Sequence, residues 1–115
     1  MTPPTDSQQL GDAFRPADAL DRLTADRRSV TVFEHGTLQV KLYAPRGTDP
    51  QTPHTRDEVY VVVSGRGQYF DGVARRSFEP GDLLFAPAGC VHRFEQFTDD
   101  LAVWVLFYGP EGGGK

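Results

Sequence analysis

The apolar residues of this chain fall into short segments that are separated by clusters of Gly, Pro and Asp. Residues 38–43 alternate in polarity, so that Leu38, Val40 and Leu42 share one face of an extended strand. The longest apolar run, 101–108, predicts a strand that is buried on both faces. The pattern predicts eight strands in all, at 30–33, 38–43, 59–64, 67–70, 74–78, 83–86, 91–97 and 101–108. Strands this short and this frequent favour an all-β fold, either a closed barrel or a sandwich.

The segment before the first strand predicts one short helix. Pro16 suits the first turn of a helix, where its missing N–H costs nothing. The apolar positions that follow it fall on one side of an amphipathic helix and are Ala17, Ala19, Leu20 and Leu23.

Composition also predicts where the folded domain begins and ends. Residues 1–12 are rich in Thr, Pro, Ser, Gln and Asp and have little to bury, so they are expected to be flexible. The glycine-rich tail 111–115 predicts disorder. The expected organisation is a flexible N-terminal segment with its short helix at 1–28, a single barrel at 29–110 and the tail.

The overall composition restricts partners and location. A chain of 115 residues can bury the core of one domain without disulfides, and its single cysteine, Cys90, fits a reducing compartment. No apolar run approaches the roughly 20 residues of a membrane helix, and the start of the chain lacks an export signal, so a cytoplasmic location without membrane association is expected. The net charge is −4 and the basic residues form no cluster, which argues against nucleic acid as a partner.

The predicted chemistry depends on two histidines and one glutamate. His54 and Glu58 are four residues apart, so in an extended strand both side chains point to the same face. Pro87 and Gly89 predict a tight bend, after which His92 begins the next segment. In a closed sheet His92 can approach the other two side chains across the interior. Two imidazoles and one carboxylate with open positions are typical of non-haem Fe(II) sites and also suit Zn, Ni or Mn. The alternative is a structural ion pair of Glu58 with Arg56 or with a histidine, without metal.

The segment around His92 matches a known motif. Gly81, Pro87, Gly89 and His92 have the spacing of the second motif of the cupin superfamily, G-x5-P-x-G-x2-H-x3-N, with Gln96 where Asn is usual. The chain therefore resembles the small single-domain cupins of the conserved-barrel type, whose fold is a double-stranded β-helix or jelly roll.

The upstream segment resembles the first cupin motif, G-x5-H-x-H-x3,4-E-x6-G. His54 matches its second histidine, Glu58 its glutamate and Gly65 its closing glycine. The position of the first histidine is occupied by Thr52, and the leading glycine is displaced by one residue, at Gly47. The resemblance spans about 32–108 and implies a pocket for a metal and a small molecule, and a homodimer.

Several neighbouring residues are candidates for the rest of the site. Thr52 is a poor replacement for an imidazole, and Gln51 could offer a carbonyl oxygen as a fourth ligand. Tyr60 lies an even number of residues from Glu58, and Gln96 from His92, so each is expected on the same strand face as that ligand and is a candidate for substrate contacts. Arg56 could hold an anionic substrate or lie in solvent. The thiol of Cys90 could ligate, react or simply pack.

Two functions are compatible with these residues. The first is a metal-dependent enzyme, of the oxygenase or isomerase type, that acts on a small molecule with His54, Glu58 and His92 as metal ligands. The second is a non-catalytic cupin that holds a metal or small ligand for sensing or storage. The fold alone does not choose between them, because one fold supports many reactions.

Overall fold

The computed structural model describes residues 12–114. In this part of the chain one short helix is followed by eight strands, and no helix is long and apolar enough to cross a membrane. The elements are α2 (Pro16–Leu20), β1 (Ser29–His35), β2 (Leu38–Tyr43), β3 (Asp57–Ser64), β4 (Gly67–Phe70), β5 (Arg75–Phe78), β6 (Leu83–Ala86), β7 (Arg93–Glu95) and β8 (Ala102–Tyr108).

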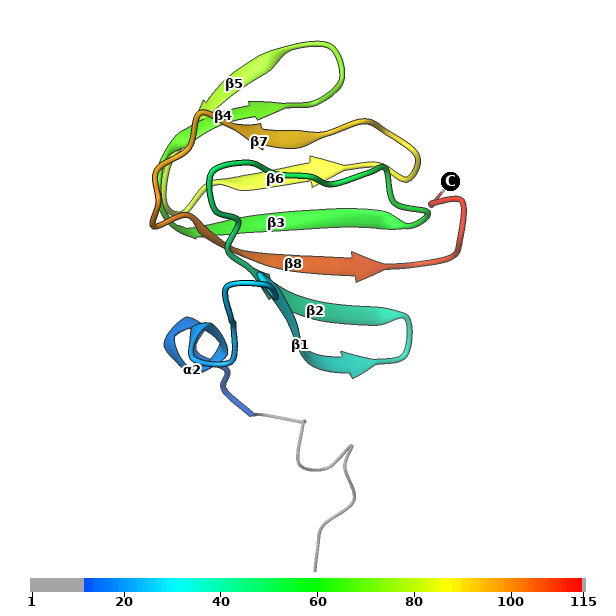
Figure 1. The fold of residues 1–115 in the computed structure, drawn as a ribbon. Helices are drawn as coiled ribbons and strands as arrows, with labels where there is room; N and C mark the ends of the chain where they lie inside the picture. The colour runs from blue at the N-terminus through cyan, green and yellow to red at the C-terminus, as the bar shows by residue number, and fades with distance from the viewer. Residues whose placement is uncertain (1–11, 115) are drawn as a thin grey trace, which may run out of the picture.

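The strands form two antiparallel sheets (Figure 1). The larger sheet has the order β1-β2-β8-β3-β6 and the smaller one the order β5-β4-β7. Neighbours in the larger sheet are mostly distant in sequence, because β8 returns to lie between β2 and β3. This arrangement is the jelly-roll barrel, and it confirms the all-β fold predicted from the strand pattern.

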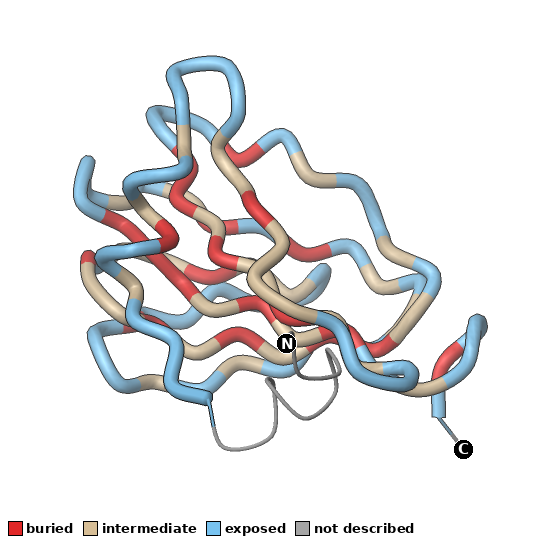
Figure 2. The backbone as a smooth tube through the Cα atoms, turned by 90° about the horizontal axis from the view of Figure 1, so that it is seen from below, coloured by how far each residue is buried: buried red, intermediate tan, exposed pale blue. Residues whose placement is uncertain are grey.

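The core lies between the two sheets, on the inward face of β3 and β8. In β3 the buried positions Glu58, Tyr60 and Val62 alternate with half-buried ones, and β8 shows the same alternation. Figure 2 shows buried stretches of the backbone in the body of the fold and exposed ones in the loops around it. The apolar members of this core are Tyr60, Val62, Tyr69, Phe78, Ala86, Phe94, Leu101, Val103, Val105 and Phe107. Because Glu58 shares its face with these residues, its carboxylate is forced into the barrel interior.

A second cluster covers part of the outer face of the larger sheet. Helix α2 places Ala19 against Val30 and Leu42, and Trp104 of β8 packs against the same group. The helix ends at Leu20, three residues before the predicted end, yet Leu23 still contacts the cluster. The prediction that the last strand is buried on both faces therefore holds on its inner side, whereas Trp104 on its outer side is half-buried.

The turn between β3 and β4 depends on a glycine. Gly65 has a φ of +92°, and a Cβ built there would lie 2.6 Å from the Cα of Leu101. A side chain would thus face both an unfavourable backbone conformation and a clash with a buried segment. This turn connects β3 of the larger sheet to β4 of the smaller one.

The seventh predicted strand is much shorter than expected. Only Arg93–Glu95 pair with β4, and Gln96 ends the strand with a φ of +49°, which non-glycine residues rarely adopt. His92 therefore lies in the loop just before β7, still buried, and Gln96 leaves the alternation of the strand.

The described part of the tail is held against the barrel, although the sequence predicted disorder from Glu111. The amide of Gly112 donates to the carbonyl of Thr55 (2.7 Å), and the amide of Gly114 donates to Asp57 Oδ2 (2.8 Å). The other oxygen of Asp57 accepts from the amide of Ala88 (2.9 Å). Asp57 thus links the tail to the loop that precedes His92. The expected flexibility of residues 1–11 and the end of the tail at 115 lie outside the described residues.

Candidate metal centre

Three segments bring His54, Glu58 and His92 together. Glu58 is the second residue of β3, His54 lies in the loop before that strand, and His92 lies in the loop before β7. Glu58 Oε1 is 3.0 Å from His92 Nε2 and 3.2 Å from His54 Nδ1. One ligand atom from each residue can be chosen so that all three lie within 4.8 Å of one another. The structure thus brings together the three side chains that the sequence pattern selected.

These close approaches become ion pairs if a histidine is protonated, but their geometry is not that of a good hydrogen bond. Both carboxylate oxygens of Glu58 and Nδ1 of His54 are buried, and among residues 12–114 none of them has a hydrogen-bond partner of acceptable geometry. An unsatisfied buried polar group costs about 1–3 kcal/mol, and more when it is charged. A single cation placed between the three atoms would satisfy all of them, because each offers a lone pair to the same point.

The proton balance of His92 also calls for a positive charge at the site. Its Nδ1 lies 3.0 Å from the carbonyl oxygen of Cys90, which can only accept, so Nδ1 carries a proton. Its Nε2 faces Glu58 Oε1 and, at 2.9 Å, the hydroxyl oxygen of Tyr60. The Tyr60 hydroxyl donates its one proton to Gln51 Oε1 (2.9 Å). Nε2 therefore faces oxygens that offer no proton, and a positive charge is required there, from either a second imidazole proton or a metal ion.

The charges at the site follow from burial and contact. Burial alone would raise the pKa of Glu58, but the neighbouring side chains His54, His92 and Tyr60 outweigh it and lower the pKa to about 2. Burial would lower the pKa of His92, yet the adjacent Glu58 and the Cys90 carbonyl raise it overall. Glu58 is thus an anion across the physiological range and attracts a cation.

A chain of hydrogen bonds extends from the site into the loop between β2 and β3. Gln51 Nε2 donates to Asp49 Oδ2 (2.8 Å), and Tyr43 donates to Asp49 Oδ1 (2.5 Å). The backbone N–H of Phe94 also donates to Asp49 Oδ2 (2.8 Å). Asp49 is 7% exposed and joins the loop to the strand that follows His92. The sequence reasoning missed Asp49, since a single acid in a Pro- and Gly-rich loop carries no local signal of burial.

The structure also places Thr52, which occupies the position of the missing histidine, and Gln51, the candidate fourth ligand. The oxygen of Gln51, proposed as a fourth ligand, accepts the Tyr60 hydroxyl, and Gln51 lies in the wall of the same cavity as His54 and Glu58. Thr52 is exposed. The position of the missing histidine is thus turned outward, and Gln51 places Tyr60 beside His92.

The site opens to the outside through two adjoining cavities. A cavity of about 130 Å³ reaches Glu58 and His54 and is lined by Ser29, Lys41, Tyr43, Gln51, His54, Glu58, Val105 and Phe107. An outer groove of about 250 Å³ is lined by Gln39, Lys41, His54, Thr55, Arg56 and Phe107. Lys41, His54 and Phe107 line both, so the two spaces meet at the entrance. Arg56 lines the outer groove, so a substrate contact for it stays a prediction.

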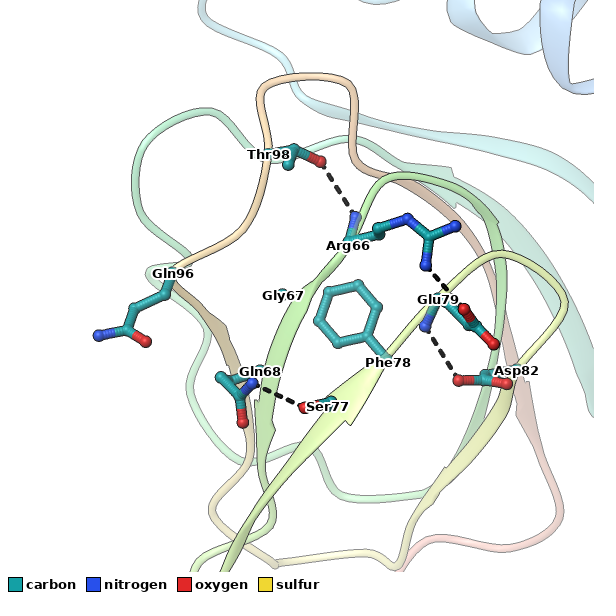
Figure 3. A pocket seen from close by; sticks show the side chains of 9 residues that line it. All are labelled: Arg66, Gly67, Gln68, Ser77, Phe78, Glu79, Asp82, Gln96 and Thr98. Atoms are coloured by element: carbon teal, nitrogen blue, oxygen red, sulfur yellow. Dashed lines mark hydrogen bonds and ion pairs between the residues drawn. The ribbon is translucent and has the colours of Figure 1, made fainter.

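Gln96 is not brought to the site. It is exposed and lines a separate surface pocket of about 580 Å³ between β4, β5 and the segment after β7 (Figure 3). The polar groups of that pocket mostly bond to one another, as in the ion pair between Arg66 and Glu79 (2.7 Å) and the hydrogen bond between Gln68 and Ser77 (2.9 Å). Gln96 does not share the face of His92 because β7 ends at Glu95, before the alternation of the strand reaches it. Cys90 contributes its carbonyl oxygen, and its thiol is not among the metal-ligand atoms that converge in the described structure.

Comparison with known proteins agrees with the fold and the site. The sequence model of the cupin domain matches residues 39–108, more than half of the chain. The chain belongs to the cupin family.

Individual relatives extend this result. The chain is 38% identical over 106 residues to an uncharacterized protein of Streptomyces coelicolor, covering 86% of this chain and 97% of that protein. Over 65 residues it is 38% identical to acireductone dioxygenase 1 of Pectobacterium atrosepticum, covering 51% of this chain and 37% of the dioxygenase. A cupin-2 domain protein of Shewanella frigidimarina shares the fold, with a TM-score of 0.67 at 17% identity over 84% of this chain and 94% of that one.

Proposed function

We propose that this cupin is a metal-dependent enzyme in which His54, Glu58 and His92 hold one divalent transition metal ion, Fe, Mn, Ni or Zn. The observation that carries the proposal is the set of buried polar atoms without a hydrogen-bond partner at Glu58 and His54, which lie close to His92 Nε2. Three protein ligands leave positions open, as catalytic metal sites require. When bound, such a metal polarises a coordinated oxygen or activates a small molecule for reaction.

The chain's own residues provide the surroundings for that chemistry. The Cys90 carbonyl holds the His92 ring in one orientation, and Gln51 holds the Tyr60 hydroxyl beside it. Val105 and Phe107 form an apolar wall of the cavity. A small substrate in the cavity would therefore lie between the apolar wall and the side chains of His54 and Glu58, with the buried Tyr60 hydroxyl behind them holding its contact with His92.

The reaction type proposed is that of an oxygenase or an isomerase. The two-histidine, one-carboxylate set with open positions supports the oxygenase. The partial match to a protein named acireductone dioxygenase is consistent with it, although the chain aligns with only 37% of that protein.

One observation favours the alternative of a non-catalytic binding cupin. Burial and the charge of Glu58 raise the pKa of Tyr60, so its hydroxyl keeps its proton and does not act as a base. With His54, Glu58 and His92 engaged as ligands, no other acid or base lines the 130 Å³ cavity except Lys41 and Tyr43. Such a site could hold a ligand without converting it.

The test separates metal binding from turnover. Elemental analysis of protein purified without chelator should give about one transition metal per chain. Protein loaded separately with Fe(II), Mn, Ni and Zn is then incubated under air with phenols, keto acids and sugars, and oxygen uptake and product formation are measured. Tyr60→Phe should retain the metal and lose turnover, whereas Tyr108→Phe, an exposed tyrosine, and Gln96→Ala should retain both. Tight binding of a compound in every metal form without any conversion would replace the enzyme by the binding cupin.

A further inference from the structure

The inward face of β2 carries a lysine, Lys41, beside the apolar core residues of β8. Lys41 is paired in register with Val105 of β8, and Val105 is paired with Tyr60 of β3, so the three side chains lie in one row across the sheet. Val105 and Tyr60 are both core residues. The residues on either side of Lys41, Val40 and Leu42, are buried on the opposite face. A charged side chain has thus been placed on the side of β2 that faces the barrel.

Lys41 has no anionic partner in the described structure. It is half-buried, and among residues 12–114 it takes part in no ion pair. It lines both the 130 Å³ cavity and the 250 Å³ groove, so Lys41 lies on the route between solvent and Glu58. A lysine held in this position without a partner is available to an incoming anion.

A second cation lies on the same route. Arg56 lines the outer groove, donates to the carbonyl of Thr37, and has its guanidinium 5.9 Å from the centre of the Phe107 ring. No carboxylate pairs with it among the described residues, and the groove has no acidic residue in its lining. Glu58 is the single acid that lines the inner cavity. The chain as a whole carries a net charge of −4, so a cationic entrance runs against its composition.

We infer that the site takes a small carboxylate, whose anionic group binds Lys41, with Arg56 at the outer end for a longer molecule. The inference rests on the proposed function, because a second oxygen of the same ligand would lie toward the metal ligands His54 and Glu58. A cavity of about 130 Å³ has the volume of about four water molecules in the liquid, which suits an acid of a few heavy atoms. A 2-oxo or 2-hydroxy acid has this size and offers two oxygens on adjacent carbons.

The experiment compares an acid with its neutral isostere. Pyruvate and pyruvamide are titrated calorimetrically into metal-loaded protein at fixed ionic strength, and metal content is measured first for every variant. Pyruvate should bind at least about tenfold more tightly than pyruvamide, because only the acid forms a charge-assisted contact with the lysine. Lys41→Met should abolish the difference, and Lys41→Arg should retain most of it. Arg76→Gln, which removes one exposed positive charge elsewhere, should leave it unchanged.

The outcomes separate this inference from the proposed function. Equal affinities for pyruvate and pyruvamide in wild-type protein with a full complement of metal would overturn the inference alone. An equal loss of affinity for both probes in Lys41→Met would also overturn it, since it would mean that the lysine stem merely covers Phe107. Wild-type protein without metal would contradict the proposed function. A preference for pyruvate that depends on Lys41 in this metal-free protein would support the anion site independently of the metal.

Discussion

Replacing Asp49 by alanine should destabilise the protein strongly, although the residue is in a loop. Its two oxygens accept hydrogen bonds from the Tyr43 hydroxyl, the Gln51 amide and the backbone N–H of Phe94. Alanine would leave all three donors without their acceptor. The N–H of Phe94 should contribute the largest loss in the free energy of unfolding, because it is buried and cannot turn toward water.

The size of the effect can be worked out from the three contacts. Each orphaned donor costs about 1–3 kcal/mol when it stays buried, but the Tyr43 and Gln51 side chains lie in the wall of a cavity and can reach water. We therefore expect Asp49→Ala to lower the free energy of unfolding by about 3–4 kcal/mol, mostly through Phe94. Asp49→Asn keeps one accepting oxygen and should cost less, about 1–2 kcal/mol.

Urea denaturation followed by circular dichroism measures these differences. Asp99→Ala, an exposed acid of the same type, is the matched control and should change stability by less than about 0.5 kcal/mol. Tyr43→Phe should be destabilising in the wild-type background and almost neutral in Asp49→Ala, because the two residues share one hydrogen bond. A loss below about 1 kcal/mol for Asp49→Ala would refute the view that Asp49 connects the loop to Phe94.

Three further predictions test other parts of the structure. His92→Ala should lower metal affinity by more than the roughly 10–100-fold that is typical of residues outside the ligand set; dialysis followed by elemental analysis would show this, and unchanged retention would mean that the ligand set is wrong. Deleting residues 111–115 should lower stability by about 1–2 kcal/mol, because Asp57 and Thr55 lose their bonds to the tail; an unchanged melting temperature would mean that these contacts are not maintained in solution. Leu83 (66% exposed) and Phe85 (49% exposed) lie on edge strand β6 and are expected to pair two copies of the chain; light scattering should give a dimer for wild type and a monomer for Leu83→Glu, and a wild-type monomer at high concentration would remove the expectation.

The sequence predicted the strands well where alternation was regular. In β3 the period of two placed Glu58 and Tyr60 on one face, and both are buried in the barrel. The motif spacing placed His92 near them because the Pro and Gly bend fixed the direction of the chain. These features are local, so a pattern along the chain contains them.

What the sequence did not predict depends on contacts between distant segments. Asp49 bonds to Phe94, forty-five residues away, and nothing near Asp49 in the chain indicates that partner. Gln96 was placed in the site by extending a strand that stops one residue earlier, where the backbone adopts a positive φ. Lys41 reads as the polar member of an alternating strand, and only the closure of the sheet shows that its polar face points inward.

The aromatic packing behind Glu58 determines how molecules move through the site. Tyr60, Tyr69, Phe78 and Phe94 are each at most 3% exposed and their rings contact one another edge to face, so they fill the barrel on that side. Among residues 12–114, the cavity at Glu58 meets the outer groove at Lys41, His54 and Phe107, so a molecule that enters there is expected to leave by the same opening. For an enzyme of this shape, departure of the product and arrival of the next substrate are mutually exclusive, and accumulated product should inhibit competitively. Release of the product through the opening at Lys41 would therefore set an upper limit on the turnover rate.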